Sequence, residues 1–152
     1  MMRKTWMAFI LINMMACTPT QQLVYQRTGM VSCTSHDRMT ISLLSEGQAE
    51  TLDKAVGFAE RNAIENLLFK GIPNSNQEKP LIKNESMAKR DNPDFFTTFV
   101  TNRGYQEFVT NSTVEDDYLN GKIHFVKQKI VFDLTNLKKH LQAQGISRKF
   151  GL

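Results

Sequence analysis

The sequence predicts an α+β fold: a small antiparallel sheet of about four strands, with a long amphipathic helix packed on one face and a C-terminal helix. Three observations support this prediction. Two pairs of β-leaning runs each enclose a turn signal, one long segment repeats apolar residues at helical spacing, and a shorter amphipathic segment follows the second pair. We therefore expect the order ββ-α-(α)-ββ-α in a single domain over residues 23–152.

The first hairpin is predicted from residues 23–34 and 39–44, which are rich in Val, Tyr, Thr and Met. Residues 35–38, Ser-His-Asp-Arg, are typical of the turn between them. The apolar spacing changes at residues 45–47, Ser-Glu-Gly, so the second strand is expected to end before them.

Residues 48–70 show the strongest helical pattern in the chain. Apolar side chains recur there in steps of three and four at Ala49, Leu52, Ala55, Val56, Phe58, Ala59, Ala63, Ile64, Leu67 and Leu68. Gly71 is placed to end this helix, and Pro73 prevents its continuation. Asp53 and Glu60 fall outside the apolar face and are interpreted as solvated surface charges.

Residues 72–94 contain three of the four prolines and are predicted to form a long, mostly irregular surface loop. A short helix is expected to follow from Pro93 and Asp94, because proline and an acidic residue favour a helix start. Phe95, Phe96 and Phe99 would then pin the loop to the core, or alternatively form an exposed apolar patch.

The second hairpin is predicted from residues 105–115 and 122–134, with residues 116–121 as the turn because they end in Asn-Gly. The apolar residues of its last strand share one parity: Val126, Ile130, Phe132 and Leu134. Thr135 is expected to cap a final helix that Gly145 ends.

No constellation of catalytic residues is found in the sequence. It lacks a glycine-rich phosphate loop, a serine elbow and paired metal-binding cysteines, and His36, His124 and His140 fall on different elements. The acidic run 115–117 is interpreted as a solvated hairpin end, with metal binding or acid–base catalysis as the alternative. We expect no enzymatic activity, no metal and no cofactor.

The N-terminus has the order of a secretory signal peptide: Arg3 and Lys4, an apolar run over residues 6–16, then Cys17. The Ala-Cys ending resembles the lipobox of bacterial lipoproteins, although Met replaces the Leu that is common in that motif. The resemblance implies cleavage before Cys17 and a lipid on its thiol. An ordinary secretory signal is the alternative.

Three segments of the chain follow from that resemblance. Residues 1–16 would be the signal peptide, residues 17–22 a polar tether, and residues 23–152 the domain. A threonine at position 18, rather than aspartate, is similar to the sorting signal of outer-membrane lipoproteins that face the periplasm. The mature chain would then carry a net charge of about +2, which is too small to indicate nucleic-acid binding.

With Cys17 lipidated, Cys33 is left without a disulfide partner and is interpreted as a buried small hydrophobe. The core must then stabilise the domain without a disulfide framework.

Residues 39–70 resemble the FlgT/LPP20 type of envelope protein in their strand, Gly47, and Ala-rich helix with Arg61-Asn62-Ala63. This resemblance implies a non-catalytic protein that associates with an envelope assembly or secretion machine. The alternative is a periplasmic small-ligand or cell-wall binding module, with a cleft beneath residues 72–94. Two surfaces are candidates for partner binding. One is the basic end of the loop 72–94, with Lys83, Lys89 and Arg90, and the other is the C-terminal tail, with Arg148, Lys149 and Phe150.

Overall fold

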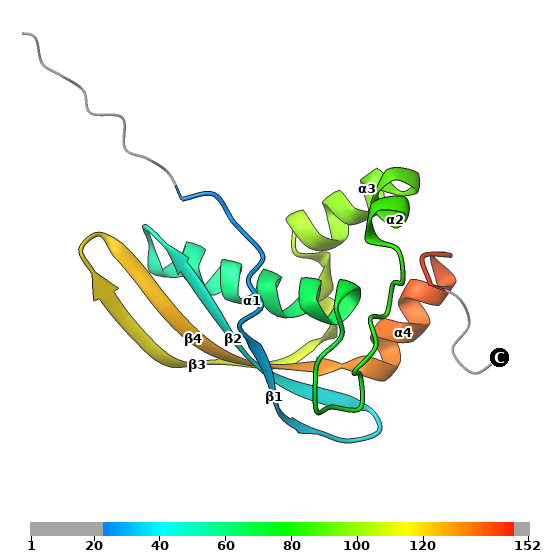
Figure 1. Ribbon diagram of the computed structural model, residues 1–152, viewed down its shortest axis with the longest axis horizontal. Coiled ribbons are helices and arrows are strands. Elements are labelled where there is room, and N and C mark those ends of the chain that lie inside the picture. Colours follow the sequence, from blue (N-terminus) through cyan, green and yellow to red (C-terminus); the bar gives the residue numbers. More distant parts are fainter. Residues whose placement is uncertain (1–22, 148–152) are drawn as a thin grey trace, which may run out of the picture.

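The computed structural model describes residues 23–147, which form one antiparallel sheet in the order β1-β2-β4-β3 with α1 packed across one face (Figure 1). The strands are β1 (Val31–His36), β2 (Thr40–Ala49), β3 (Val109–Asn120) and β4 (Ile123–Asp133). The helices are α1 (Leu52–Phe69), α2 (Glu85–Asp91), α3 (Pro93–Phe96) and α4 (Leu134–Ala143), with a π-helical turn, η1 (Thr97–Thr101), and a 3₁₀ turn, η2 (Gly104–Phe108). The predicted α+β class is confirmed. The predictions made for residues 1–22, Cys17 among them, and for Arg148, Lys149 and Phe150 lie outside the described residues.

The first hairpin differs from its prediction at both ends. β1 begins at Val31, and residues 23–30 run beside α1 outside the sheet. β2 continues through Gly47 to Ala49, where the sequence predicted a break. Glycine is needed at position 47 because α1 crosses this part of the strand: a β-carbon there would lie 2.2 Å from the Ala55 carbonyl oxygen. The glycine marks close packing of a helix on a strand rather than the end of the strand.

The helix α1 is shorter than its predicted range, and most of its polar side chains are buried. Thr51 caps its first turn by accepting from the Lys54 amide, and Gly71 follows its end with φ +80°. The prediction that Glu60 is a surface charge is wrong, since its residue is only 5% exposed. Polar residues of α1 are buried because segments outside the helix, among them those that carry Thr28 and Arg103, pack against them. The other polar residues in this position are Asn62, Glu65 and Asn66.

The loop 72–94 is anchored to the core. Ile72, Leu81 and Ile82 are buried, and the backbone amides of Leu81 and Ile82 donate to carbonyls near the end of α1. The end of the loop is not irregular, because α2 forms there with Asn84 as its cap. Phe96 and Phe99 are buried, which confirms that the phenylalanines pin this region to the core.

The second hairpin is shifted relative to its prediction: residues 105–108, predicted as the start of its first strand, belong to η2, and β3 begins at Val109. β3 continues through Asp116 and Asp117 to Asn120, so these residues belong to a strand and not to a turn, and Gly121 (φ +63°) makes the reversal. The predicted parity of β4 is confirmed, because Val126, Ile130 and Phe132 are all buried under α1. Asp133, rather than Thr135, caps α4 by accepting from the Asn136 amide.

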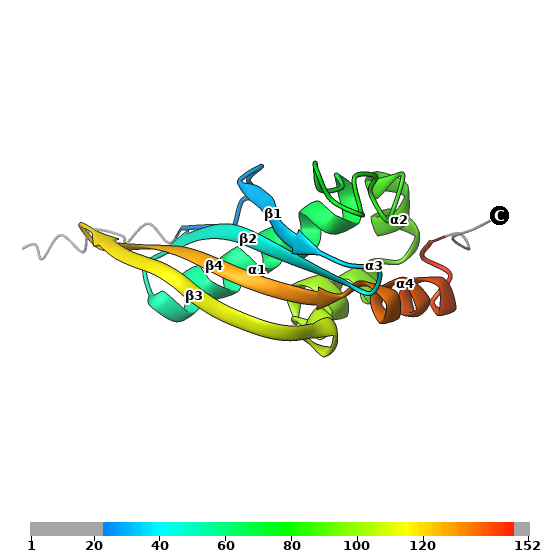
Figure 2. The same ribbon diagram turned by 90° about the horizontal axis from the view of Figure 1, so that it is seen from below.

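The domain is elongated, with two distinct ends. Figures 1 and 2 agree that the tip of the β3–β4 hairpin, the first turn of α1 and the start of the described chain at Leu23 gather at one end. α4 and the last described residues lie at the other end. Within residues 23–147, no helix is both long and apolar enough to cross a bilayer.

Candidate functional site

The most prominent surface feature is the unpaired end of β2. Pairing of β1 with β2 begins at Val31, opposite Ser45, whereas pairing of β2 with β4 continues to Ala49, opposite His124. The last four residues of β2 therefore have a strand neighbour on one side only. A strand edge of this kind offers unpaired backbone groups to a further polypeptide.

The chain before β1 leaves this edge open because two asparagines of α1 hold it elsewhere. The Asn62 side chain accepts from the Thr28 amide (2.9 Å) and donates to the Thr28 hydroxyl (2.8 Å). Asn66 donates to the Thr28 carbonyl (2.9 Å) and also to the Asn62 carbonyl (2.8 Å). These bonds pull residues 23–30 onto α1, away from β2.

Tyr25 fastens the same segment nearer its start. Its ring packs edge-on against Phe58 with centroids 5.3 Å apart, the Arg61 guanidinium lies 4.2 Å from its ring centre, and its hydroxyl donates to Glu65 (3.1 Å). Burial, followed by the nearby Glu65 carboxylate, raises the pKa of the Tyr25 hydroxyl, so this hydroxyl stays protonated at neutral pH.

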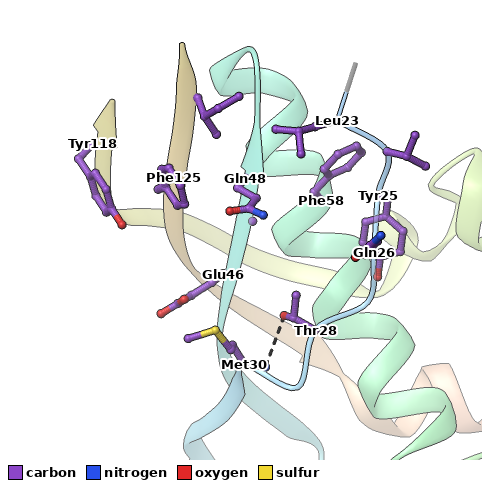
Figure 3. A pocket seen from close by; sticks show the side chains of 13 residues that line it. Leu23, Tyr25, Gln26, Thr28, Met30, Glu46, Gln48, Phe58, Tyr118 and Phe125 are labelled. Carbon is purple, nitrogen blue, oxygen red and sulfur yellow. Dashed lines mark hydrogen bonds between the residues drawn. The ribbon is translucent and has the colours of Figure 1, made fainter. Parts of the chain in front are cut away.

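A groove of about 870 Å³ follows the unpaired end of β2 (Figure 3). Its floor is Glu46, Gly47 and Gln48; one wall is the segment from Leu23 to Met30 together with Phe58, and the other is formed by the β3–β4 hairpin. On the hairpin wall Tyr118 and Phe125 face each other across the strands, with parallel rings and centroids 5.0 Å apart. We refer to this site as the β2 groove.

The alternation of hydrogen-bonding directions along a strand determines which backbone groups of the groove floor are unpaired. The Thr40 carbonyl accepts from Asp37 on the β1 side of β2, so every second residue along β2 turns its backbone polar groups to that side. Glu46 and Gln48 share this parity. The Glu46 carbonyl accepts from Asn62 (3.3 Å), whereas no strand in residues 23–147 pairs with Gln48 on this side. The Gln48 N–H and C=O are therefore free to bond a neighbouring strand.

Charge in the groove is modest and mostly paired. Glu46 lies 3.5 Å from the Lys127 ammonium across the open face of the sheet, and Glu50 accepts from the Leu23 amide. His124 and Asp117 approach to 3.4 Å on the hairpin. The groove thus offers aromatic walls and backbone hydrogen bonds rather than a concentrated charge.

A second, smaller cavity of about 450 Å³ lies at the other end of the domain. Phe95, Phe99 and His140 line it together with Asp94 and Glu107. The rings of Phe95 and His140 are stacked 6.0 Å apart. Of the loop 72–94, beneath which a cleft was expected, only its last residue, Asp94, lines one of these two cavities.

Glu60 is a buried carboxylate surrounded by polar side chains from three other elements. It accepts from Arg103 (2.5 Å), and the side chains of Tyr105, Gln106, Ser112 and Gln128 also approach it within 3.5 Å. Neither cavity is lined by Glu60. We therefore interpret this cluster as a structural connection between α1, η2 and the β3–β4 hairpin.

Of the predicted surface residues, those that the structure describes are Lys83, Lys89 and Arg90, and none of them lines either cavity. Lys83 is exposed, and Arg90 pairs with Asp91 (2.8 Å). Lys89 pairs with Glu85 (2.7 Å), which also pairs with Arg27 (2.8 Å) of the segment that forms one wall of the groove. Among residues 23–147, no group of three or more His, Cys, Asp or Glu side chains could hold a metal ion. Cys33 is half-buried, and burial raises the pKa of its thiol, which lowers its reactivity.

Comparisons with protein-family models, with curated proteins and with solved structures found no match. The function of the chain is therefore inferred from its own geometry.

The β2 groove was missed by the sequence analysis, although one signal was present. On β4 the residues of outward parity include Lys127, Lys129 and Asp133, and Phe125 is an aromatic exception on this face. Tyr118 on the opposing strand is a second exception. Two aromatic residues paired across strands on the face of the sheet that α1 does not cover indicate a contact surface.

Proposed function

We propose that this protein is a non-enzymatic, lipid-anchored envelope protein, attached through Cys17 to the outer membrane on its periplasmic side, that binds an extended segment of a partner protein in the β2 groove. The observation that favours protein binding is the unpaired end of β2 between two apolar walls. Strand addition of this kind uses backbone hydrogen bonds for affinity and side-chain pockets for selectivity.

The dimensions of the groove suit a short peptide. Four residues of β2, Glu46 to Ala49, extend beyond β1, and a strand of similar length alongside them would occupy the position that β1 leaves vacant. Alternate side chains of such a peptide would point towards Phe58 and Tyr25 on one side and towards Phe125 and Tyr118 on the other. We expect an apolar or aromatic residue at every second position of the peptide.

A lipid at Cys17 would assist such binding by confinement. Attachment to a membrane raises the local concentration of the domain near partners in the same membrane, so a modest intrinsic affinity suffices.

The proposal is tested by selecting ligands from a library of random short peptides and measuring their affinities for single variants. Gln48→Pro removes the free N–H of the groove floor, and proline is tolerated at a strand edge. Gln48→Ala keeps this N–H, so we expect it to weaken binding much less than Gln48→Pro does.

A second pair of variants tests the aromatic wall. Phe125→Ala removes a ring that lines the groove, whereas Val131→Ala truncates an apolar residue of the same strand and face outside the groove. We expect Phe125→Ala to weaken peptide binding about tenfold and Val131→Ala to leave it unchanged. Binding in the β2 groove would be contradicted if Phe125→Ala and Val131→Ala weakened peptide binding equally. It would also be contradicted if Gln48→Pro left the affinity of the selected peptides unchanged.

A further inference from the structure

We propose that the end of the domain formed by the tip of the β3–β4 hairpin rests on the phospholipid surface to which the chain is anchored. This inference rests on the proposed lipid at Cys17 and adds an orientation: the β2 groove would open immediately beside the membrane.

The exposed apolar residues of this end are the first observation. Leu119 is 59% exposed and Tyr118 55% exposed, both next to the hairpin turn. Val24 is 78% exposed at the start of the described chain, and Leu52 is exposed in the first turn of α1. Large side chains of this kind are stable at a bilayer interface, where tyrosine in particular places its ring and hydroxyl at headgroup level.

These residues come from three separate segments that the fold brings together. Leu23, Val24, Tyr118 and Ile123 line the same groove. The Leu23 amide donates to Glu50, two residues before α1 begins. The hairpin tip, the start of α1 and residue 23 accordingly share one end of the molecule in both views of Figures 1 and 2.

The length of chain between the anchor and the domain is the second observation. From Cys17 to Leu23 the chain has six residue steps, which span about 20 Å even when fully extended. A lipid on Cys17 inserts into the bilayer, so residue 23 must stay within that distance of the headgroups. The end that carries residue 23 is therefore the end that faces the membrane.

The charges at this end do not select strongly for anionic lipid. Lys54 on α1 pairs with Glu50 (3.7 Å) and lies beside Asp53, and Lys122 at the turn is offset by Asp117 further along β3. We therefore expect apolar insertion to provide most of the affinity, with Lys122 extending its ammonium towards lipid phosphates.

The test places a polarity-sensitive fluorophore at the hairpin tip. Leu119→Cys is introduced in the full chain together with Cys33→Ser, so that the thiol introduced at position 119 is the labelling site when Cys17 carries lipid. The lipidated protein is reconstituted into vesicles of phosphatidylethanolamine and phosphatidylglycerol. We expect a blue-shifted emission, several-fold lower quenching by aqueous iodide, and strong quenching by a lipid-attached quencher.

Met87→Cys in the same background is the matched control. Met87 is an exposed apolar residue on α2, with 51% exposure, and Figure 1 shows α2 away from the tip of the β3–β4 hairpin. Its label should remain accessible to iodide when vesicles are present.

The intact mass of the protein separates the two ways in which the account can fail. A lipid-sized mass on Cys17 together with a fully aqueous label at position 119 would overturn the membrane orientation and leave the proposed anchor standing. An unmodified Cys17 would refute the anchor, and the orientation inferred from the tether would fall with it.

Discussion

Gly47 of β2 lies directly against the backbone of Ala59 on α1: a β-carbon at position 47 would stand 2.5 Å from the Ala59 amide nitrogen. The same β-carbon would lie 2.2 Å from the Ala55 carbonyl oxygen. Because both neighbours are backbone atoms, rotation of a side chain cannot relieve the overlap. The contact fixes the separation of α1 from the sheet at the position where the β2 groove begins.

Gly47→Ala is therefore expected to lower the free energy of unfolding by about 3 kcal/mol, since the helix or the strand must shift. Gly57→Ala is the matched control within α1, where an added β-carbon meets nothing within 4 Å. That change should raise stability by about 0.5–1 kcal/mol, because alanine favours a helix interior over glycine. Urea unfolding of both variants measures these changes. If Gly47→Ala raised the free energy of unfolding as Gly57→Ala does, the close approach of α1 to β2 would be contradicted.

Asn62→Ala should release residues 23–30 from α1. The change removes the acceptor of the Thr28 amide and the donor to its hydroxyl, which we expect to cost about 1–3 kcal/mol. Amide hydrogen exchange at Thr28 should accelerate strongly. Asn111→Ala, at an exposed position on β3, is the control and should change stability by less than about 0.5 kcal/mol.

The polar residues of α1 explain one limit of the sequence analysis. Periodicity located the apolar face correctly, from Ala55 to Leu68, because burial against a sheet requires it. It could not show that Glu60 and Asn62 are also buried, since their partners Arg103 and Thr28 are 43 and 34 positions away in the chain. Hydrogen bonds across such separations leave no local pattern in a single sequence.

Arg103 combines an ion pair with an unusual backbone conformation. It has φ +61° and pairs with buried Glu60, while its own side chain is 43% exposed. Arg103→Ala should lower stability by about 2 kcal/mol, because the carboxylate keeps other donors and the arginine is partly solvated. Arg103→Gly should lose about 1 kcal/mol less than Arg103→Ala, since glycine adopts positive φ without strain. A higher midpoint of thermal unfolding for Arg103→Ala than for Arg103→Gly would contradict this explanation.

Two tyrosines, the buried Tyr105 and the half-buried Tyr25, predict a loss of stability at high pH. Burial, and then the Glu65 carboxylate, raises the pKa of Tyr25; burial, and then Glu60, raises the pKa of Tyr105. In the unfolded chain both hydroxyls ionise near pH 10. Above that pH the unfolded state loses protons that the folded state retains, so the free energy of unfolding falls as pH rises.

The slope should approach about 1.4 kcal/mol per pH unit for each tyrosine. Tyr105→Phe and Tyr25→Phe should each reduce the slope between pH 10 and pH 11, as measured by urea unfolding at successive pH values. A slope that neither change alters would show that both hydroxyls ionise equally in the folded and unfolded states.

The second hairpin and the groove show what else a sequence can and cannot reveal. The predicted parity of β4 was correct because α1 covers one face of that strand, and every second residue must then be suited to burial. The turn was misplaced because Asp116 and Asp117, which are unfavourable in strands, lie on an exposed edge that tolerates them. The groove arises from where β1 stops pairing with β2, which depends on the Thr28 contacts with α1.

The central claim is that Cys17 anchors the domain to a membrane. Its most direct test is the intact mass and membrane partitioning of the full-length chain and of Cys17→Ala, both expressed in a Gram-negative host. We predict a membrane-bound product that begins at Cys17 and has a lipid-sized mass increment, which the variant lacks. A soluble product of the full-length chain, cleaved elsewhere and without added mass, would contradict the claim.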